Sequence, residues 1–281
     1  MKLSLVNEWG LVISSVNGTR PGTSQGASVT PTQNTTGGAY ATLLASGSVT
    51  EDVYAIDICV NSIGTSGAAR DALATLAIDP AGGTSFTDVA DLLCGQAASV
   101  ASGGAGGVWF HFPLWLKAGT TIGMRGSVNS ATLTAFQAYV RVYCKPSRPE
   151  LIWCGQKIEQ LGVTAGTSTG TSVTPGTVSE GAWTSIGTLT RSHRFFEFGF
   201  GCNDAALNNN GYNVDVSIGD ASNKKIIALD RLVSTANTEN VTKLASPIWA
   251  NASASDIAYV RMQCGPNAVG TVSATVYAMG D

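Results

Sequence analysis

Residues 22–31 read GTSQGASVTP, and residues 166–175 read GTSTGTSVTP, at an offset of 144 positions. The match extends upstream to Trp9 and Trp153, and ten of the 23 positions in this window are identical without a gap. Internal repeats of this kind set the number of domains before any other feature is considered. The sequence therefore predicts two copies of one module that arose by internal duplication.

The match continues further along the chain with a slipped register. Leu76–Asp79 corresponds to Val216–Gly219, and Pro113–Trp115 corresponds to Pro247–Trp249. Each copy has about half of the 281 residues, which is enough to bury a core of its own. Length and repeat therefore agree on two domains.

Strand signals dominate both copies. The runs are short, rich in β-branched and aromatic residues, and many of them alternate with a period of two. They lie at residues 53–60, 73–78, 135–143, 195–200, 214–218 and 273–277, with clusters of Gly, Asn, Ser and Asp between them. About eight strands per module are expected, which is the number in a jelly roll. The predicted fold is all-β, with two tandem jelly-roll-like antiparallel β-sandwiches. Two segments, Asp88–Leu93 and Ala228–Val233, also fit one turn of helix.

Proline marks the boundary between the copies, because Pro146 and Pro149 interrupt the strand pattern and stiffen the link. We predict an N-terminal arm at residues 1–21, a first module at 22–145, a link that repeats the arm at 146–165, and a second module at 166–281. A tryptophan-containing element precedes the Gly-Thr-Ser stretch in both copies. We expect this element to reach a neighbouring module or subunit.

Composition excludes several classes of protein. Charged residues make up 12% of the chain, against roughly 25% in an average soluble domain, and the net charge is −3. Without a cluster of Lys and Arg, binding to nucleic acid is not expected. The start of the chain does not resemble a signal peptide, and no stretch approaches the roughly 20 apolar residues of a membrane span. We expect synthesis in the host cytoplasm.

The six cysteines lack the C-x-x-C spacing of zinc and redox sites. Free Cys is among the most buried residue types. We therefore expect buried free thiols at positions 59, 94, 144, 154, 202 and 264.

No catalytic signature emerges, and the protein is not expected to be an enzyme. Ser24 and Ser168 match G-x-S-x-G, but a nucleophile elbow requires a following helix and a general base. The two histidines, His111 and His193, do not correspond between the copies, so a flexible linker explains the serine motif better. The acidic residues that could act as paired carboxylates fall mostly at expected strand ends and turns, at Asp57, Asp71, Asp79, Asp88 and Asp91.

No metal site and no cofactor are predicted. We interpret His111 as a surface or subunit-contact residue that faces opposite to Phe110 and Phe112, and His193 as an exposed turn residue. The loop 203–211 is rich in Asn and Asp, but it fails the EF-hand pattern at both ends. A hairpin connection is the simpler interpretation, and a structural cation on loop carbonyls stays an alternative.

Tryptophan is the residue type that best supports a binding function. Trp115 corresponds to Trp249, and Trp183 corresponds to Tyr40, so these repeated aromatic residues are interpreted as core. Trp109 has no counterpart and lies next to a glycine-rich loop. It is our candidate for an exposed contact with a glycan or a protein partner.

Several segments resemble β-sandwich virion proteins of tailed bacteriophages and prophages. They are the Gly-x-Ser-Val-Thr-Pro stretch at 26–31, Gly38-Ala39-Tyr40, its counterpart Gly181-Ala182-Trp183, the strand end at 77–82, and the segment FPLWLKAGTTI at 112–122. The resemblance implies a structural protein of the tail, its fibres or the capsid surface, with other virion proteins as partners. Three copies with two modules each would place six similar domains around one axis, so a homotrimer is favoured. The alternative is a carbohydrate-binding module that recognises a glycan on the host surface.

Overall fold

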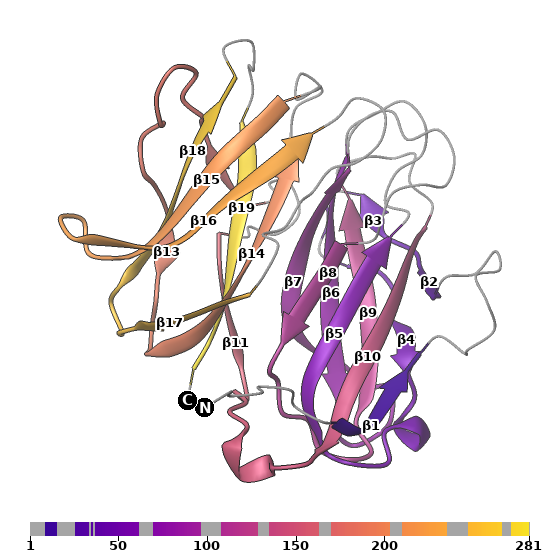
Figure 1. Ribbon diagram of the computed structural model, residues 1–281. Coiled ribbons are helices and arrows are strands. Elements are labelled where there is room, and N and C mark those ends of the chain that lie inside the picture. Colours follow the sequence, from indigo (N-terminus) through magenta and orange to yellow (C-terminus); the bar gives the residue numbers. More distant parts are fainter. Residues whose placement is uncertain are drawn as a thin grey trace.

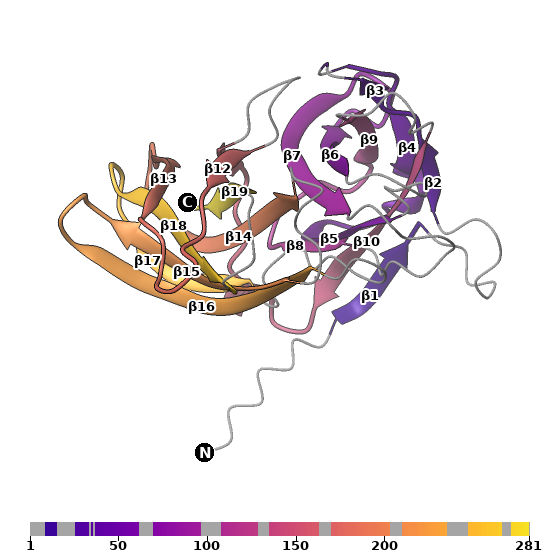
Figure 2. The same cartoon turned by 90° about the horizontal axis from the view of Figure 1, so that it is seen from above.

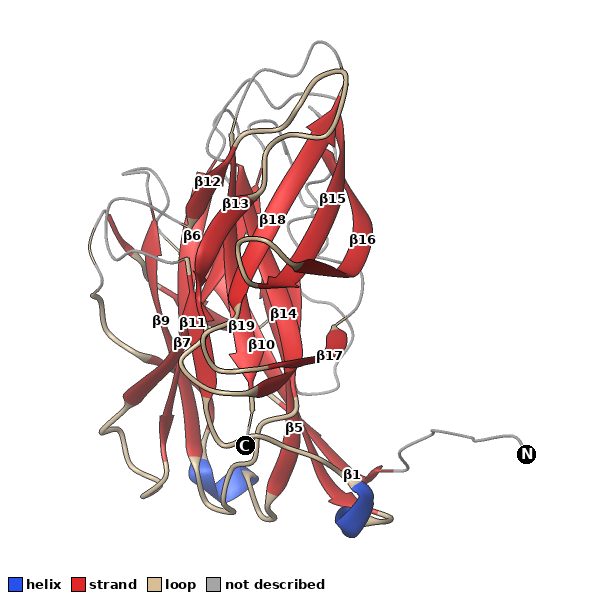
Figure 3. Ribbon diagram, turned by 90° about the vertical axis from the view of Figure 1, so that its left-hand side faces the viewer, coloured by secondary structure: helices blue, strands red, loops and turns tan. Residues whose placement is uncertain are grey.

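A computed structural model describes residues 9–15, 26–33, 35, 37–61, 70–96, 108–128, 135–162, 170–202, 210–234, 247–265 and 271–280. Within these ranges the chain forms β-strands and two single turns of 3-10 helix, η1 (Ser46–Ser48) and η2 (Pro149–Leu151). The strands make two sandwiches that lie side by side in Figure 1, and Figure 3 shows that strands make up nearly all of the regular structure. The predicted all-β fold with tandem antiparallel sandwiches is confirmed.

The first sandwich has two sheets. One contains β1 (Trp9–Ser14), β10 (Phe136–Pro146), β5 (Val53–Asn61) and β8 (Val108–Phe112) in that order, and β2 (Ala27–Val29) also pairs with β10. The other contains β3 (Thr32–Gln33), β9 (Thr121–Val128), β6 (Arg70–Asp79) and β7 (Thr87–Gln96), and β4 (Ala41–Leu44) also pairs with β9. Every pair is antiparallel except β3 with β9.

The second sandwich repeats this order. One sheet contains β11 (Ile158–Leu161), β19 (Val272–Met279), β14 (His193–Cys202) and β17 (Ile248–Ala252), and β12 (Thr171–Val173) also pairs with β19. The other contains β13 (Thr184–Thr188), β18 (Ile257–Cys264), β15 (Asn210–Gly219) and β16 (Lys224–Ser234). A shared strand order is what a duplication leaves behind. The duplication itself stays a prediction, because connection rules allow few topologies for any sandwich.

Strand β10 shows why these sequences form sheets. Phe136, Ala138, Val140 and Val142 are fully buried, whereas the intervening residues are half-buried. This period of two places one face against the opposite sheet and turns the other face outward.

The second sandwich packs against the edge of the first that is formed by β7 and β8. Tyr277 on β19 is fully buried, and its ring lies edge-on to Phe110 and Phe112 of β8, with centroids 5.7 and 5.9 Å away. Its hydroxyl accepts a hydrogen bond from the Leu93 amide (2.6 Å) and donates one to the Asp91 carbonyl (2.7 Å), both on β7. In Figure 2, β14 and β19 lie beside β7 and β8. The core of the first module therefore extends across the contact into the second module, which also has a core of its own.

Two sequence interpretations need correction. The segments Asp88–Leu93 and Ala228–Val233 lie within strands β7 and β16, because each pairs with a long neighbouring strand. The predicted arms differ. The first folds onto its own module, because β1 pairs with β10. The second pairs through β11 with β19 and also reaches the first module, since the Gly155 amide donates to the Pro113 carbonyl and Gln160 accepts a hydrogen bond from the Asp91 amide.

The two Pro-x-Trp segments, which match with a slipped register, lie at different ends of their strands. Pro113–Trp115 follows β8, whereas Pro247–Trp249 leads into β17, the strand that holds the same place in the sheet order. The residues after β8 connect to the link between the modules, since the Trp115 amide donates to the Gly155 carbonyl at 3.0 Å. The boundaries predicted around 146–165 stay predictions.

Candidate functional site

Trp109 lies on the outer face of the first module, where β8 runs beside β5. Its side chain is 36% exposed. Tyr139 packs edge-on against the indole at 5.0 Å between centroids, and the Arg141 guanidinium lies 5.6 Å from the ring centroid. Both partners come from β10, the strand on the other side of β5. The indole is therefore held by an edge contact and a cation–π contact while part of it faces solvent.

His111, two residues further along β8, joins a partly buried hydrogen-bond cluster on the same face. Its Nδ1 lies 2.6 Å from Asp57 Oδ1, and the Tyr143 hydroxyl donates to the other carboxylate oxygen. Burial raises the pKa of the Asp57 carboxyl, but the hydrogen bonds from His111 and Tyr143 outweigh it and hold the pKa below its usual value. Asp57 is therefore ionised at neutral pH and fixes the orientation of the imidazole.

A His–Asp pair suggests nucleophilic catalysis only when a nucleophile lies within reach. The thiol on this face belongs to Cys59, and burial raises its pKa to about 11. A thiol with that pKa stays protonated at neutral pH and is a poor nucleophile. Ser24 and Ser168, the serines of the predicted motif, lie outside the described residues.

The structure corrects the interpretation of His193. This residue begins β14 and is fully buried, whereas the sequence suggested an exposed turn. Its Nε2 lies 2.5 Å from Glu159 Oε2 on β11, and the Thr190 amide donates to the other oxygen at 2.8 Å. Both histidines thus pair with a carboxylate far away in sequence. No local spacing signals either pair, because the partners meet only through strand pairing.

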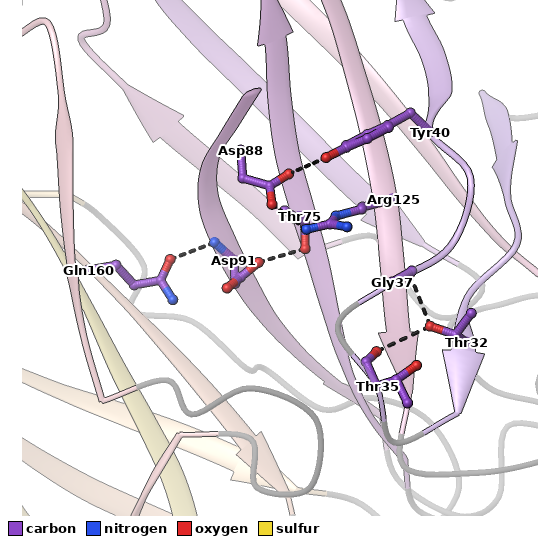
Figure 4. A network of polar contacts seen from close by, with 9 residues as sticks. All are labelled: Thr32, Thr35, Gly37, Tyr40, Thr75, Asp88, Asp91, Arg125 and Gln160. Carbon is purple, nitrogen blue, oxygen red and sulfur yellow. Dashed lines mark hydrogen bonds and ion pairs between the residues drawn. The ribbon is translucent and has the colours of Figure 1, made fainter. Parts of the chain in front are cut away.

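A second polar cluster lies on the opposite sheet of the first module (Figure 4). The Tyr40 hydroxyl donates to Asp88 at 2.8 Å, and Arg125 pairs with the same carboxylate while lying 5.1 Å from the Tyr40 ring. In the second module, Arg261 lies 4.5 Å from the Trp183 ring. Each ring thus has an arginine beside it from the strand at the same place in the sheet order, β9 or β18, as the predicted correspondence between Tyr40 and Trp183 would require; the correspondence itself stays a prediction.

The predicted acidic residues do not gather into one site. Asp57 lies in the middle of β5, which the sequence had not suggested. Asp79 accepts hydrogen bonds from the amides of Ala81 and Ser85 and so shapes the turn after β6. Asp88 binds Tyr40 and Arg125 as above, and Asp91 accepts from the Thr75 hydroxyl at 2.6 Å. The side chain of Asp71 lies outside the described residues.

Two tryptophans contradict the core interpretation. Trp115 is 37% exposed and Trp249 is 59% exposed. The thiol prediction is confirmed for Cys59, Cys94, Cys144 and Cys264, which are buried and free. Cys154 is free but only half-buried, and the side chain of Cys202 lies outside the described residues.

In the described ranges, no three His, Cys, Asp or Glu side chains form a group that could hold a metal ion. The loop 203–209, where a structural cation was considered, lies outside them. Among the described residues, no helix has the length and apolar character to span a membrane.

No protein-family model and no curated protein sequence matches this chain. Among solved structures, it is similar to PNGF-II, with 8% identity, a TM-score of 0.40, and coverage of 96% of this chain and 66% of that chain. The STIV MCP has 9% identity, a TM-score of 0.38 and 96% coverage of both chains. The tandem CBM22-1 and CBM22-2 domain of Xyn10C from Paenibacillus barcinonensis has 14% identity, a TM-score of 0.23, and coverage of 86% and 83%. Likenesses of this strength carry no argument about function.

Proposed function

We propose that this chain is a non-enzymatic structural subunit of a bacteriophage particle, in the tail, its fibres or the capsid surface. The observation that carries the proposal is the buried contact between the modules, in which Tyr277 of the second module is fully buried against Phe110 and Phe112 of the first. Two sandwiches joined in this way form one rigid block. A rigid block with defined outer faces suits repeated assembly, and the sequence resemblance of residues 112–122 to virion proteins points the same way.

The test is to purify intact particles from an infected or induced culture and to quantify this chain by mass spectrometry. A fixed copy number per particle, in a simple ratio to the major virion proteins, is the expected result. Absence of the chain from intact particles would overturn the proposal.

A second candidate function is recognition of a host-surface glycan, and the surroundings of Trp109 favour it. The half-exposed indole lies beside the Arg141 guanidinium and the Asp57–His111 pair. Aromatic rings with polar neighbours are the surface on which a sugar ring can stack and hydrogen-bond.

A glycan screen of the intact chain tests this function. Trp109→Ala should abolish the signal with folding retained. Trp115→Ala is the matched control, because its side chain is 37% exposed against 36% for Trp109 and lies outside the outer sheet face. Equal loss in both variants, or no glycan bound by the native chain, would exclude the second function.

A further inference from the structure

The contact between the two modules joins a sheet face to a sheet edge. On the second module it uses the outer face of β11, β19 and β14, where Ile158, Phe195, Tyr277 and Met279 belong to the core of the first module. On the first module it uses β8 and the outer side of β7. There Leu93 is fully buried, and the Asp91 amide donates to Gln160 of β11 (Figure 4).

The strand register shows which face of the first module is equivalent to this outer face of the second module. Val29 lies opposite Phe136, and Val173 lies opposite Val272, so the repeat at an offset of 144 aligns β10 with β19. Counting along these strands, Arg141 takes the place of Tyr277, and Tyr143 takes that of Met279. Val12 lies opposite Tyr143 on β1, as Ile158 lies opposite Met279 on β11.

The strand register also shows which edge of the second module is equivalent to the β7 edge of the first module. The strand ends that correspond in sequence, Leu76–Asp79 and Val216–Gly219, close β6 and β15. Ala90 pairs with Leu76, and Ala228 pairs with Val216. Leu229 on β16 is therefore the equivalent of Asp91 on β7. Within the chain, the second module covers Asp91.

Exposure differs sharply between these equivalent positions. Ile158 is 9% exposed, whereas Val12 is 45% exposed. Leu229 is 70% exposed, and Ile226 nearby on β16 is 46% exposed. Both belong to a surface groove that also holds Asp215 and Arg261. Of the eight exposed large hydrophobic side chains in the described residues, three lie on these two surfaces, and a fourth, Trp109 on β8, packs beside the first against Tyr139 of β10. The chain thus presents the structural equivalent of each half of its own interface, with Arg141 in place of Tyr277 and Arg231 in place of Leu93.

We propose that copies of this chain associate head to tail. The outer face of β1, β10 and β5 of one copy packs on β16 of the next, as β11, β19 and β14 pack on β7 within the chain. A second copy is the partner because the chain itself shows which surface fits which edge. Such a heterologous contact builds rings when its rotation closes and filaments when it does not. A ring of three places six modules around the axis. The inference rests on the proposed role as a structural subunit.

The test measures absolute mass by light scattering with gel filtration over a concentration series. The native chain should form an assembly larger than a dimer. Leu229→Asp and Val12→Asp should each reduce it to monomers, since each variant loses one of the two surfaces. A mixture of both should give a dimer and stop there, because one intact face then meets one intact edge. Leu151→Asp is the matched control, 69% exposed on η2, and should keep the native mass.

Circular dichroism confirms that each variant is folded. A native chain that stays monomeric at every concentration would overturn the inference. So would a self-association that Leu229→Asp abolishes and Val12→Asp leaves intact, which is the behaviour of a symmetric contact. The mass series tests the head-to-tail contact, and the particle analysis tests the virion role, so one proposal can fail while the other holds. A chain that assembles as described but is absent from particles retains the head-to-tail contact and loses the virion role.

Discussion

At the scale of single residues, Tyr277 joins the two modules through two ring contacts and two hydrogen bonds. Its hydroxyl satisfies one backbone donor and one backbone acceptor of β7, both in a site without solvent. The buried hydroxyl itself has a pKa raised well above its usual value by desolvation, so it stays a neutral donor. The sequence indicated a strand at this position but gave no sign that its tyrosine belongs to the core of the other module.

Tyr277→Phe should lower the free energy of unfolding by about 1–3 kcal/mol, because the Leu93 amide and the Asp91 carbonyl are left buried without a partner. Urea titration of both proteins measures the difference. Tyr54→Phe, on the half-buried position of β5, is the control and should change the value by less than about 0.5 kcal/mol. Equal effects of the two substitutions would contradict the role assigned to Tyr277.

Glu159 predicts a dependence of stability on pH. Burial raises the pKa of its carboxyl, but hydrogen bonds from Thr190 and His193 outweigh burial, and the pKa lies below its ordinary value of 4.5. A lowered folded-state pKa gives stability that is present above the ordinary value and is lost as pH falls through the folded-state pKa. The advantage of the native chain over Glu159→Gln should therefore shrink as pH falls from about 5 to about 3.

Urea titrations at several pH values follow this advantage. Glu150→Gln, at an exposed position of η2, is the control, and its difference from the native chain should stay within about 0.5 kcal/mol throughout. An advantage of the native chain over Glu159→Gln that is constant with pH would show that the carboxylate form contributes nothing to folding.

At the scale of elements, β9 contains two glycines, Gly123 and Gly126, that make room for the rings of Phe86 and Phe136. A Cβ on Gly126 would lie 2.5 Å from the ring of Phe136, which is fully buried and cannot move aside. Gly126→Ala should therefore destabilise the chain by roughly 1–3 kcal/mol through overpacking. Thermal or urea unfolding checks the value. Gly47→Ala, with no heavy atom within 4 Å of the new Cβ, should be nearly neutral, and similar losses in both would contradict the packing argument.

Elements also show where sequence patterns mislead. Asp88–Leu93 has the composition of a helical turn, yet it forms part of β7 because ladder pairing with β6 runs from Arg70 to Ile78. An outward position of β7 is apolar as well, since Leu93 is covered by the second module. A strand covered on both faces loses the alternation by which a strand is recognised.

At the scale of the whole molecule, the buried contact between the modules predicts cooperative unfolding. Separating the modules would expose Phe110, Phe112 and Phe195, all fully buried, together with the partners of Tyr277. Calorimetry of the intact chain should therefore show one transition whose calorimetric and van't Hoff enthalpies agree. Two resolved transitions would mean that the sandwiches unfold as independent domains and would remove the main support for a rigid block.

The sequence by itself determined the all-β class, the number of modules and the inward residues of strands such as β10, because these follow from local alternation and from a repeat. It also indicated the correspondence of Tyr40 with Trp183 and the exposed position of Trp109. Only the tertiary structure decided that Asp57 meets His111, that Glu159 meets His193, and that the second sandwich packs on the β7 and β8 edge of the first. These contacts join residues far apart in the chain, and their geometry depends on strand order and sheet packing, which leave no mark in local sequence.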